Sequence, residues 1–175
     1  KQLPNVVSPD IREVSNRVFS RFAINPAYHY ADNSLLSSIT KIYDDVTRTL
    51  LKEHYRCHPQ IIGFCNQKYY NNELIILTEA AEGDKPLVVY KTAKGNHARG
   101  NYNQRQIDVI IGEVLPQQVK DEAKSVGIVS PYRHQKEKLL EMLDGRSIEV
   151  DTVHMYQGRE RDIIILTTVV NEIND

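Results

Sequence analysis

The second half of the chain alternates between short apolar runs and longer stretches with helical periodicity. Four apolar runs predict strands, at residues 87–90, 126–129, 147–153 and 162–170. Between them, one predicted helix is capped by Asn103 and carries an apolar stripe as far as Leu115, and another covers residues 135–143 and ends at Gly145. Strands that alternate with helices of this length predict an α/β fold with a mostly parallel sheet and helices on both faces.

The first half of the chain is less regular. Three helices are predicted there, over residues 11–22, 35–43 and 59–70. Asp10 and Ser34 are the predicted caps of the first two, and Pro59 stands near the start of the third. A turn is predicted at residues 83–86, where a glycine and a proline fall close together.

Composition bounds the class of protein. The 175 residues are enough for one ordinary domain, and 41% hydrophobic with 26% charged residues is typical of a globular chain. No apolar run approaches the roughly 18 residues that span a bilayer, so no membrane partner is expected. The 22 basic and 23 acidic residues give a net charge of −1, so overall charge does not indicate nucleic acid. Cys57 and Cys65 form no disulfide framework, which favours the cytoplasm or the nucleus.

Two loops that follow predicted strands are dense in polar groups, at residues 130–135 and 152–162. Ligands of parallel α/β sheets gather at the carboxyl ends of the strands, where such loops leave. Gly158 would let a ligand approach the backbone, Arg159 suits a phosphate and Glu160 suits a ribose hydroxyl. Ser130 and Thr152 suit a phosphodiester. The alternative is a solvated turn between strands.

A second polar block lies at residues 52–59, directly before a predicted helix. Tyr55 is suited to stack on a base and Arg56 to reach a phosphate, and the alternative is a charged loop. The block and the following helix also contain possible metal ligands, namely His54, Cys57, His58 and Cys65. Their positions do not form the paired short spacings of a structural zinc site, so no metal site is expected.

Four segments, in this order, resemble motifs of superfamily 1 helicases. Lys1–Pro4 is similar to the end of motif III, Tyr55–Pro59 to a Tyr-Arg-Met-His-Pro segment, Val126–Tyr132 with Gln135 to motif IV, and Val150–Leu166 to motif V. The order and spacing match over nearly the whole chain, and the branch is the Upf-like and Dna-type superfamily 1B. The resemblance implies the second RecA-like domain of such a helicase, a three-layer α/β/α fold.

The resemblance also implies roles for matched positions. Gln2 and Arg56 would be catalytic, because Gln2 would sense the γ-phosphate and Arg56 would act on it as an arginine finger. Tyr55 would stack on adenine, and the remaining nucleotide contacts would come from Gly158, Arg159 and Glu160. The track of a single strand would be lined by Ser130, Pro131, Tyr132, Thr152 and His154.

Two motifs of that family are missing from the sequence, namely the phosphate loop and the acidic magnesium motif. The family carries both in its first RecA-like domain, so the resemblance implies ATP bound between that domain and this one, with Mg²⁺ held mainly by the first. Residues 1–50 would then follow motif III, and residues 51–175 would be the motor domain, truncated before motif VI. The start at Lys1 agrees with a piece of a longer ATP-dependent helicase, inactive alone, moving 5′ to 3′ on single-stranded nucleic acid, with DNA expected rather than RNA.

Two other readings stay open. A non-catalytic RecA-like module that binds nucleic acid or protein would share the fold, and a phosphate loop upstream would distinguish the motor from it. A small-ligand enzyme of the flavodoxin or dehydrogenase type is less favoured, because residues 95–100 lack the G-x-G-x-x-G spacing.

Overall fold

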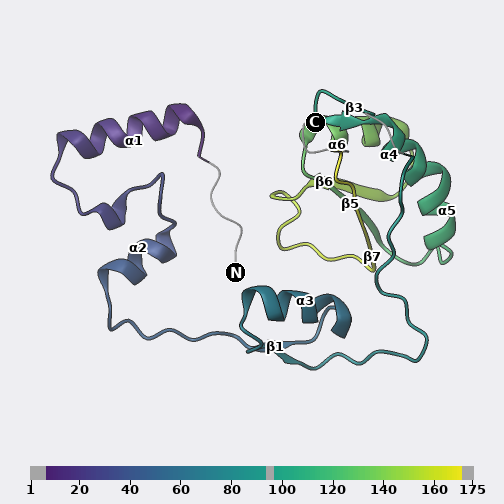
Figure 1. Ribbon diagram of the computed structural model, residues 1–175, viewed down its shortest axis with the longest axis horizontal. Coiled ribbons are helices and arrows are strands. Elements are labelled where there is room, and N and C mark those ends of the chain that lie inside the picture. Colours follow the sequence, from purple (N-terminus) through teal and green to yellow (C-terminus); the bar gives the residue numbers. More distant parts are fainter. Residues whose placement is uncertain (1–6, 94–96, 171–175) are drawn as a thin grey trace. The chain divides into compact units, whose positions relative to one another are not determined.

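The computed structural model describes residues 7–93 and 97–170. The chain divides into two compact units, Lys1–Leu87 and Val88–Asp175 (Figure 1). Each unit is described below by itself. The boundary drawn from the sequence at residue 50 lies inside the first unit.

The second unit is built on a three-stranded parallel sheet. Its strands are β5 (Val126–Ser130), β6 (Ile148–Thr152) and β7 (Ile163–Leu166), in the order β6–β5–β7. Every residue of the central strand β5 is buried, which explains why its sequence is a continuous apolar run rather than an alternation. The predicted α/β fold with a parallel sheet is confirmed, although β7 ends at Leu166 instead of Val170.

One continuous helical stretch precedes β5. It consists of α4 (Gln104–Val109), a π-helical turn η2 (Ile110–Val114) and α5 (Leu115–Gln118). Asn103 caps it as predicted, because its side-chain oxygen accepts the Gln106 N–H at 3.1 Å. The π turn ends two residues before Pro116, which has no N–H and whose ring would collide with the carbonyl of Gly112 in a regular α-helix.

The hydrophobic core forms on one face of the sheet. Side chains alternate along a strand, so Val126 and Ile128 share a face, and the register adds Val150 and Ile165 to it. The apolar sides of the α4–α5 stretch and of α6 (Arg133–Met142) both pack against these residues. Their contributions are Ile107, Val109, Ile110, Val114, Leu115, Leu139 and Leu143. The core therefore links both helical segments to all three strands.

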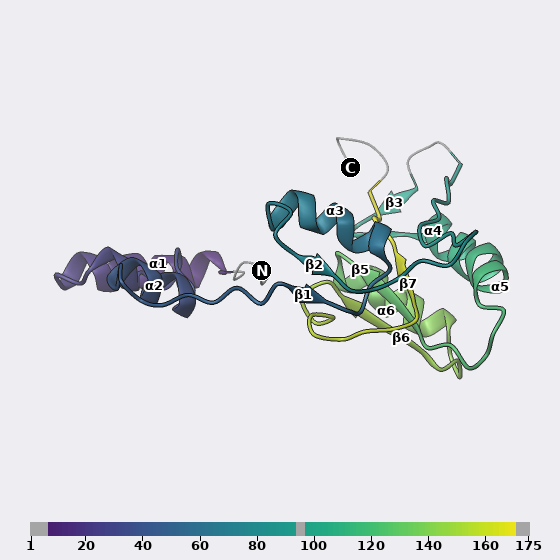
Figure 2. The same cartoon turned by 90° about the horizontal axis from the view of Figure 1, so that it is seen from below.

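The other face of the sheet is crossed by the segment 153–162. The steps from β5 to β6 and from β6 to β7 run in opposite directions across the sheet, so two right-handed crossovers must use opposite faces. Helix α6 occupies the first, and residues 153–162 occupy the second, as the yellow-green segment that leads into β7 in Figure 2. Part of this face stays open, since Ile164 and Leu166 are 43% and 72% exposed.

A buried polar network joins α4, α6 and the end of β7. The fully buried Gln135 accepts the Asn103 N–H at 2.8 Å and donates to the Thr167 hydroxyl at 3.1 Å. Asn103 donates to the Val169 carbonyl at 2.8 Å, and the Val169 N–H donates to Gln106 at 3.0 Å. These bonds hold Val169 at a φ of 69°, a conformation that β-branched residues rarely adopt.

The run 87–90 is not a strand, which corrects the prediction. No strand within the described residues pairs with it, and Val89 is 85% exposed. Tyr90 instead donates its hydroxyl to Gln117 at 3.0 Å and accepts from Gln118 at 2.7 Å. A short antiparallel hairpin follows, made of β3 (Ala98–Arg99) and β4 (Tyr102–Asn103).

The first unit opens with three helical elements, α1 (Pro9–Arg21), η1 (Pro26–Tyr28) and α2 (Leu35–Ile42). Ser8, not Asp10, caps α1, because its hydroxyl accepts the Ile11 N–H at 3.4 Å and Pro9 fills the first helical position. The predicted cap of α2 is confirmed, since the Ser34 hydroxyl accepts the Ser37 N–H at 3.2 Å. None of the helices described in either unit is long and apolar enough to cross a bilayer.

The same unit contains a small β–α–β element. Strands β1 (Glu53–His54) and β2 (Ile75–Ile76) pair in parallel, and α3 (Pro59–Tyr69) connects them and lies alongside the ladder (Figures 1 and 2). The buried Asn66 amide bonds Leu74 twice, accepting its N–H at 2.9 Å and donating to its carbonyl at 3.2 Å. The turn predicted at residues 83–86 lies two residues earlier, where the Asp84 N–H donates to the Ala81 carbonyl at 3.2 Å and Gly83 has a φ of 89°.

Candidate functional site

Tyr55 and Arg56 directly follow β1 on an exposed turn of the first unit. Tyr55 is 67% exposed. The Cys57 N–H donates to His54 Nε2 at 2.9 Å, and the Thr78 hydroxyl donates to the Cys57 carbonyl at 2.8 Å. Because these bonds fix the backbone beside the two residues, the turn presents both side chains outward from a defined position.

His58 fixes the other end of this turn. Its Nδ1 accepts the Gln60 N–H at 3.2 Å and so caps α3, while Nε2 lies 3.6 Å from an Asp84 oxygen. His54 and His58 are therefore both occupied with local structure, and neither Cys57 nor Cys65 forms a disulfide. Across residues 7–93 and 97–170, no three His, Cys, Asp or Glu side chains gather where they could hold a metal ion.

Ser130 and Thr152 lie side by side at the carboxyl ends of β5 and β6. The Ser130 side chain has no exposed surface, and its hydroxyl both donates to the Tyr132 carbonyl and accepts the Tyr132 N–H, each at 3.1 Å. Ser130 thus shapes the turn that presents Pro131 and Tyr132. A contact between Ser130 itself and single-stranded nucleic acid stays a prediction. Thr152, by contrast, is partly exposed.

A cavity of about 330 Å³ opens beside Thr152, between the start of α6 and the end of β6. Its walls are Arg133, Lys136, Glu137, Asp151, Thr152 and Met155. The volume lies at the lower end of the range of small-ligand pockets. Sequence reasoning missed Arg133 and Lys136. Their spacing of three positions in a helix that leaves a site loop was the available signal, because it puts both on one side of the helix.

Asp151 is one of two carboxylates in the walls of this cavity, together with Glu137. Its carboxylate accepts Lys136 Nζ at 2.8 Å and the Thr152 N–H at 2.8 Å, and it lies 3.3 Å from Arg159. Burial by itself would raise the pKa of Asp151, but the bonds from Lys136 and Thr152 and the charges of Lys136 and Arg159 outweigh it and hold that pKa below its ordinary value. The carboxylate is therefore ionised at neutral pH.

Gly158 occupies the third position of a turn formed by Tyr156–Arg159. The Arg159 N–H donates to the Tyr156 carbonyl at 3.1 Å, and Gly158 has a φ of 84°. A turn of this kind needs a positive φ at its third residue, which glycine adopts without strain. No atom from elsewhere in the described structure lies within 4 Å of the place a Cβ would take, so the space over Gly158 is open. Glu160 follows at an exposed position.

Arg159 is engaged by carboxylates of the sheet. Its guanidinium pairs with Glu149 and, at 3.3 Å, with Asp151, and it lies 6.0 Å from the centre of the Tyr156 ring. Arg159 in this structure therefore fastens its loop to β6. Its contact with a phosphate stays a prediction.

The predicted site residues fall in two places. The five expected along a strand track, Ser130, Pro131, Tyr132, Thr152 and His154, all lie on the loops that leave β5 and β6. Gly158, Arg159 and Glu160 lie further along the second of these loops, where it crosses the sheet. Tyr55 and Arg56 belong to the first unit, and Gln2 lies outside the described residues.

Comparison with known families matches residues 31–175 to the AAA domain. The chain belongs to this family. Its α/β fold with a parallel sheet is the RecA-like fold expected from the sequence.

Relatives of the chain are helicases by name. A Danio rerio protein named as a helicase, mov-10-B.1, is 29% identical over 161 residues, which cover 73% of this chain and 16% of that protein. A Homo sapiens protein named as a helicase, senataxin, is 32% identical over 139 residues, or 68% of this chain and 5% of that one. A Drosophila melanogaster protein named as an RNA helicase, armi, is 25% identical over 156 residues, 73% and 13%. The chain spans less than a fifth of the length of each.

Proposed function

We propose that this chain is the second RecA-like motor domain of an ATP-dependent superfamily 1 helicase of the Upf-like 1B branch. The observation that carries the proposal is the cavity at the carboxyl ends of β5 and β6, where Thr152 stands beside Arg133 and Lys136 and the carboxylates of Glu137 and Asp151. It occurs in a domain of the AAA family whose relatives are named as helicases.

The cavity suits the sugar–phosphate backbone of a single strand. The Thr152 hydroxyl can bond a phosphate oxygen, and Arg133 supplies positive charge at the same place, whereas Lys136 is paired with Asp151 at 2.8 Å. Pro131, Tyr132 and His154 extend this surface along the two exit loops. Because the contacts are to the backbone of the nucleic acid, binding is expected to tolerate any sequence and to weaken with salt.

ATP is proposed to bind between this domain and the first RecA-like domain of the same polypeptide, which would hold most of the Mg²⁺ ligands. The residues of this chain fit such a nucleotide, since Tyr55 is an exposed ring and the turn at Gly158 leaves open space. Tyr55 would stack on adenine, Gln2 would meet the γ-phosphate, and Gly158 and Glu160 would meet phosphate and ribose. The bound metal ion would neutralise phosphate charge.

Arg56 is proposed to stabilise the charge that spreads over the transferring phosphoryl group. Its planar guanidinium presents several N–H donors to the phosphate oxygens, and arginines in this role accelerate phosphoryl transfer by about 10³- to 10⁵-fold. Opening and closing of the nucleotide site would change the grip of Thr152 on the strand. Repeated cycles would move the domain along the strand, in the 5′ to 3′ direction.

The test is ATP turnover by the full-length protein, with and without single strands of DNA or RNA of equal length. Stimulation by a single strand supports a motor. We expect DNA to stimulate more than RNA, and the comparison is direct because relatives named as RNA helicases are also known. The isolated 175-residue chain serves as the control and should show no turnover, because its sequence contains no phosphate loop.

Two results would contradict this assignment. Strand binding by the full-length protein without any ATP turnover would favour the non-catalytic RecA-like module. Turnover by the isolated chain, free of contaminating enzyme, would show that the nucleotide site needs no first domain.

A further inference from the structure

Gly127 is the second residue of the buried strand β5, and the hydroxyl end of the Tyr156 ring lies directly over it. A Cβ at residue 127 would lie 1.8 Å from the Tyr156 hydroxyl oxygen and 2.7 Å from its ring carbon Cζ. Atoms cannot approach this closely, so residue 127 must lack a side chain for the ring to lie there. Tyr156 is only 7% exposed, although it belongs to a surface loop.

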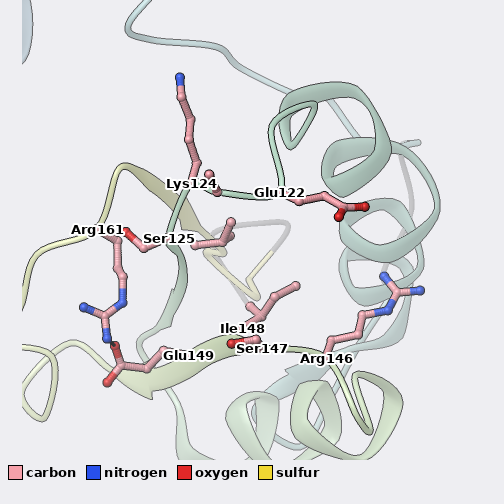
Figure 3. A pocket seen from close by; sticks show the side chains of 10 residues that line it. Glu122, Lys124, Ser125, Arg146, Ser147, Ile148, Glu149 and Arg161 are labelled. Atoms are coloured by element: carbon pink, nitrogen blue, oxygen red, sulfur yellow. Dashed lines mark ion pairs between the residues drawn. The ribbon is translucent and has the colours of Figure 1, made fainter.

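The other end of the same turn is held by charge. Arg159 pairs with Glu149 and Asp151 on β6, and Arg161 pairs with Glu149 as well. Figure 3 shows the side chains of Arg161 and Glu149 directed toward one another at the rim of a second cavity. The turn Tyr156–Arg159 is therefore fixed at both ends. The Tyr156 ring packs against β5, and the Arg159 guanidinium pairs with carboxylates of β6. Gly158 lies between them.

The far end of the loop is fixed too. The Asp162 carboxylate accepts the Ser125 N–H at 2.8 Å and its hydroxyl at 2.6 Å, and the Asp162 N–H donates to the Ser125 hydroxyl at 3.1 Å. At the near end, the Val153 N–H donates to the Ser130 carbonyl at 3.1 Å. Residues 153–162 thus follow one defined path across the sheet.

We propose that Tyr156 and Arg159 are positioning residues, which set the affinity for the nucleotide by fixing the turn that carries Gly158 and leads into Glu160, without touching the nucleotide. This inference rests on the function proposed above for Gly158 and Glu160. It assigns Arg159 to the sheet instead of a phosphate, because Glu149 and Asp151 already engage its guanidinium.

A size exchange between residues 127 and 156 tests the role of the ring. In the full-length protein, Gly127→Ala should push the ring away and Tyr156→Leu should remove it. We expect each to raise the KM for ATP about tenfold with kcat and nucleotide-free strand affinity within about twofold. Combining the two relieves the contacts of the new methyl group with residue 156 and leaves the flexible Arg161 side chain, at 3.2 Å, to move slightly, so the double variant should return the KM to within about threefold of wild type. Tyr156→Phe keeps the ring and should resemble wild type.

Removing the charges of Glu149 and Arg159, singly and together, tests the role of Arg159. If Arg159 only positions the turn, Glu149→Gln and Arg159→Met should both raise the KM for ATP, and their combination should raise it less than the product of the single effects. If Arg159 binds a phosphate directly, Glu149→Gln releases it and should lower the KM. A lowered KM would therefore overturn the assignment of Arg159.

The remaining outcomes are equally decisive. An unchanged KM in Tyr156→Leu, a defect in Tyr156→Phe as large as that in Tyr156→Leu, or a double variant no better than its parents would each overturn the role of Tyr156. An inactive wild-type protein would instead remove the proposed function. In that case, hydrogen exchange of the 153–162 N–H groups still decides the structural half, since it should quicken in Tyr156→Leu and stay slow in Tyr156→Phe.

Discussion

The turn at residues 54–58 and the loop at residues 153–162 both present candidate ligand groups just after a strand, but they are held differently. In the first, polar bonds from His54, Thr78 and His58 fix the backbone, and the ring of Tyr55 is exposed. In the second, the side chains of Tyr156 and Arg159 themselves attach the loop to β5 and β6.

This difference predicts how the two regions respond to mutation. Where neighbours fix the backbone, a side chain can be changed with little loss of stability, so an effect on activity reports on function. Where the side chain is the fastening, a change affects stability and activity together, and only matched variants separate the two.

The largest expected effect is on the first turn. Arg56→Ala in the full-length protein should reduce kcat at least about a hundredfold, or about 2.7 kcal/mol, because the guanidinium acts on charge that develops in the transition state. ATP affinity should stay within a small factor, and the melting temperature should change little. Single-turnover rates, nucleotide binding and thermal unfolding measure the three quantities.

Two matched variants sharpen this result. Arg56→Lys keeps the charge but loses the planar fork, so its rate should fall between those of wild type and Arg56→Ala. Tyr55→Ala should weaken nucleotide binding and leave kcat nearly unchanged, because a stacked base is lost equally from ground and transition states. A wild-type rate in Arg56→Ala would refute its role, and a large loss of stability would remove the contrast between the two regions.

Local patterns were the part of the structure that the sequence predicted well. The caps Asn103 and Ser34 were found because a cap and its target lie three positions apart. The strand at 126–129 was found because a buried central strand is apolar throughout. The run 87–90 has the same character but failed as a strand, since a strand also needs a partner, and a partner is not a local property.

The sequence predicted that the site lies on two loops. It did not predict that Tyr156 and Arg159 fasten the second loop to the sheet. Tyr156 and Gly127 meet because the β6–β7 connection crosses the sheet face opposite α6, which depends on strand order. A glycine inside an otherwise apolar strand was the available signal, because such a glycine often marks the close approach of another group. Gly158 was predicted for its open space, and the structure adds a second reason, its positive φ.

Gly158 gives the effect of intermediate size. Gly158→Ala should lower the free energy of unfolding by about 1–2 kcal/mol, because a φ of 84° is unfavourable for a residue with a Cβ. Gly158→Asn should lose less, since asparagine tolerates this conformation better than alanine does. Denaturant unfolding of the two variants and wild type measures the difference.

The variants Gly158→Ala and Gly158→Asn also show whether residue 158 is a glycine because of its positive φ or because a ligand needs the open space. If a nucleotide approaches the backbone closely, Gly158→Asn should lose nucleotide affinity even though it keeps most of its stability. Equal stability of all three proteins would show that the turn does not hold residue 158 at a positive φ, and would remove this loop's side of the comparison.

The smallest expected effects divide the second loop itself. Thr152→Ala should weaken nucleotide-free binding of a single strand about fivefold, which corresponds to about 1 kcal/mol for one lost neutral hydrogen bond. Thr152→Ser keeps the hydroxyl and should bind nearly as wild type does. Glu160→Gln should raise the KM for ATP and leave nucleotide-free strand affinity nearly unchanged. Glu160 lies beyond the turn Tyr156–Arg159 and two residues before Asp162, which bonds Ser125 at the amino end of β5, whereas Thr152 is at the carboxyl end of β6.

A labelled oligonucleotide, titrated with and without a non-hydrolysable ATP analogue, measures both properties in one experiment. If Thr152 contacts the nucleic acid and Glu160 contacts the nucleotide, Thr152→Ala should weaken oligonucleotide binding without the analogue. Glu160→Gln should weaken it only when the analogue is present. Equal weakening of nucleotide-free binding by both variants would mean that residues 152–160 form one nucleic-acid surface. In that case Tyr156 and Arg159 would position the loop for a nucleic-acid strand, and nucleotide affinity would depend on the turn at residues 54–58 alone.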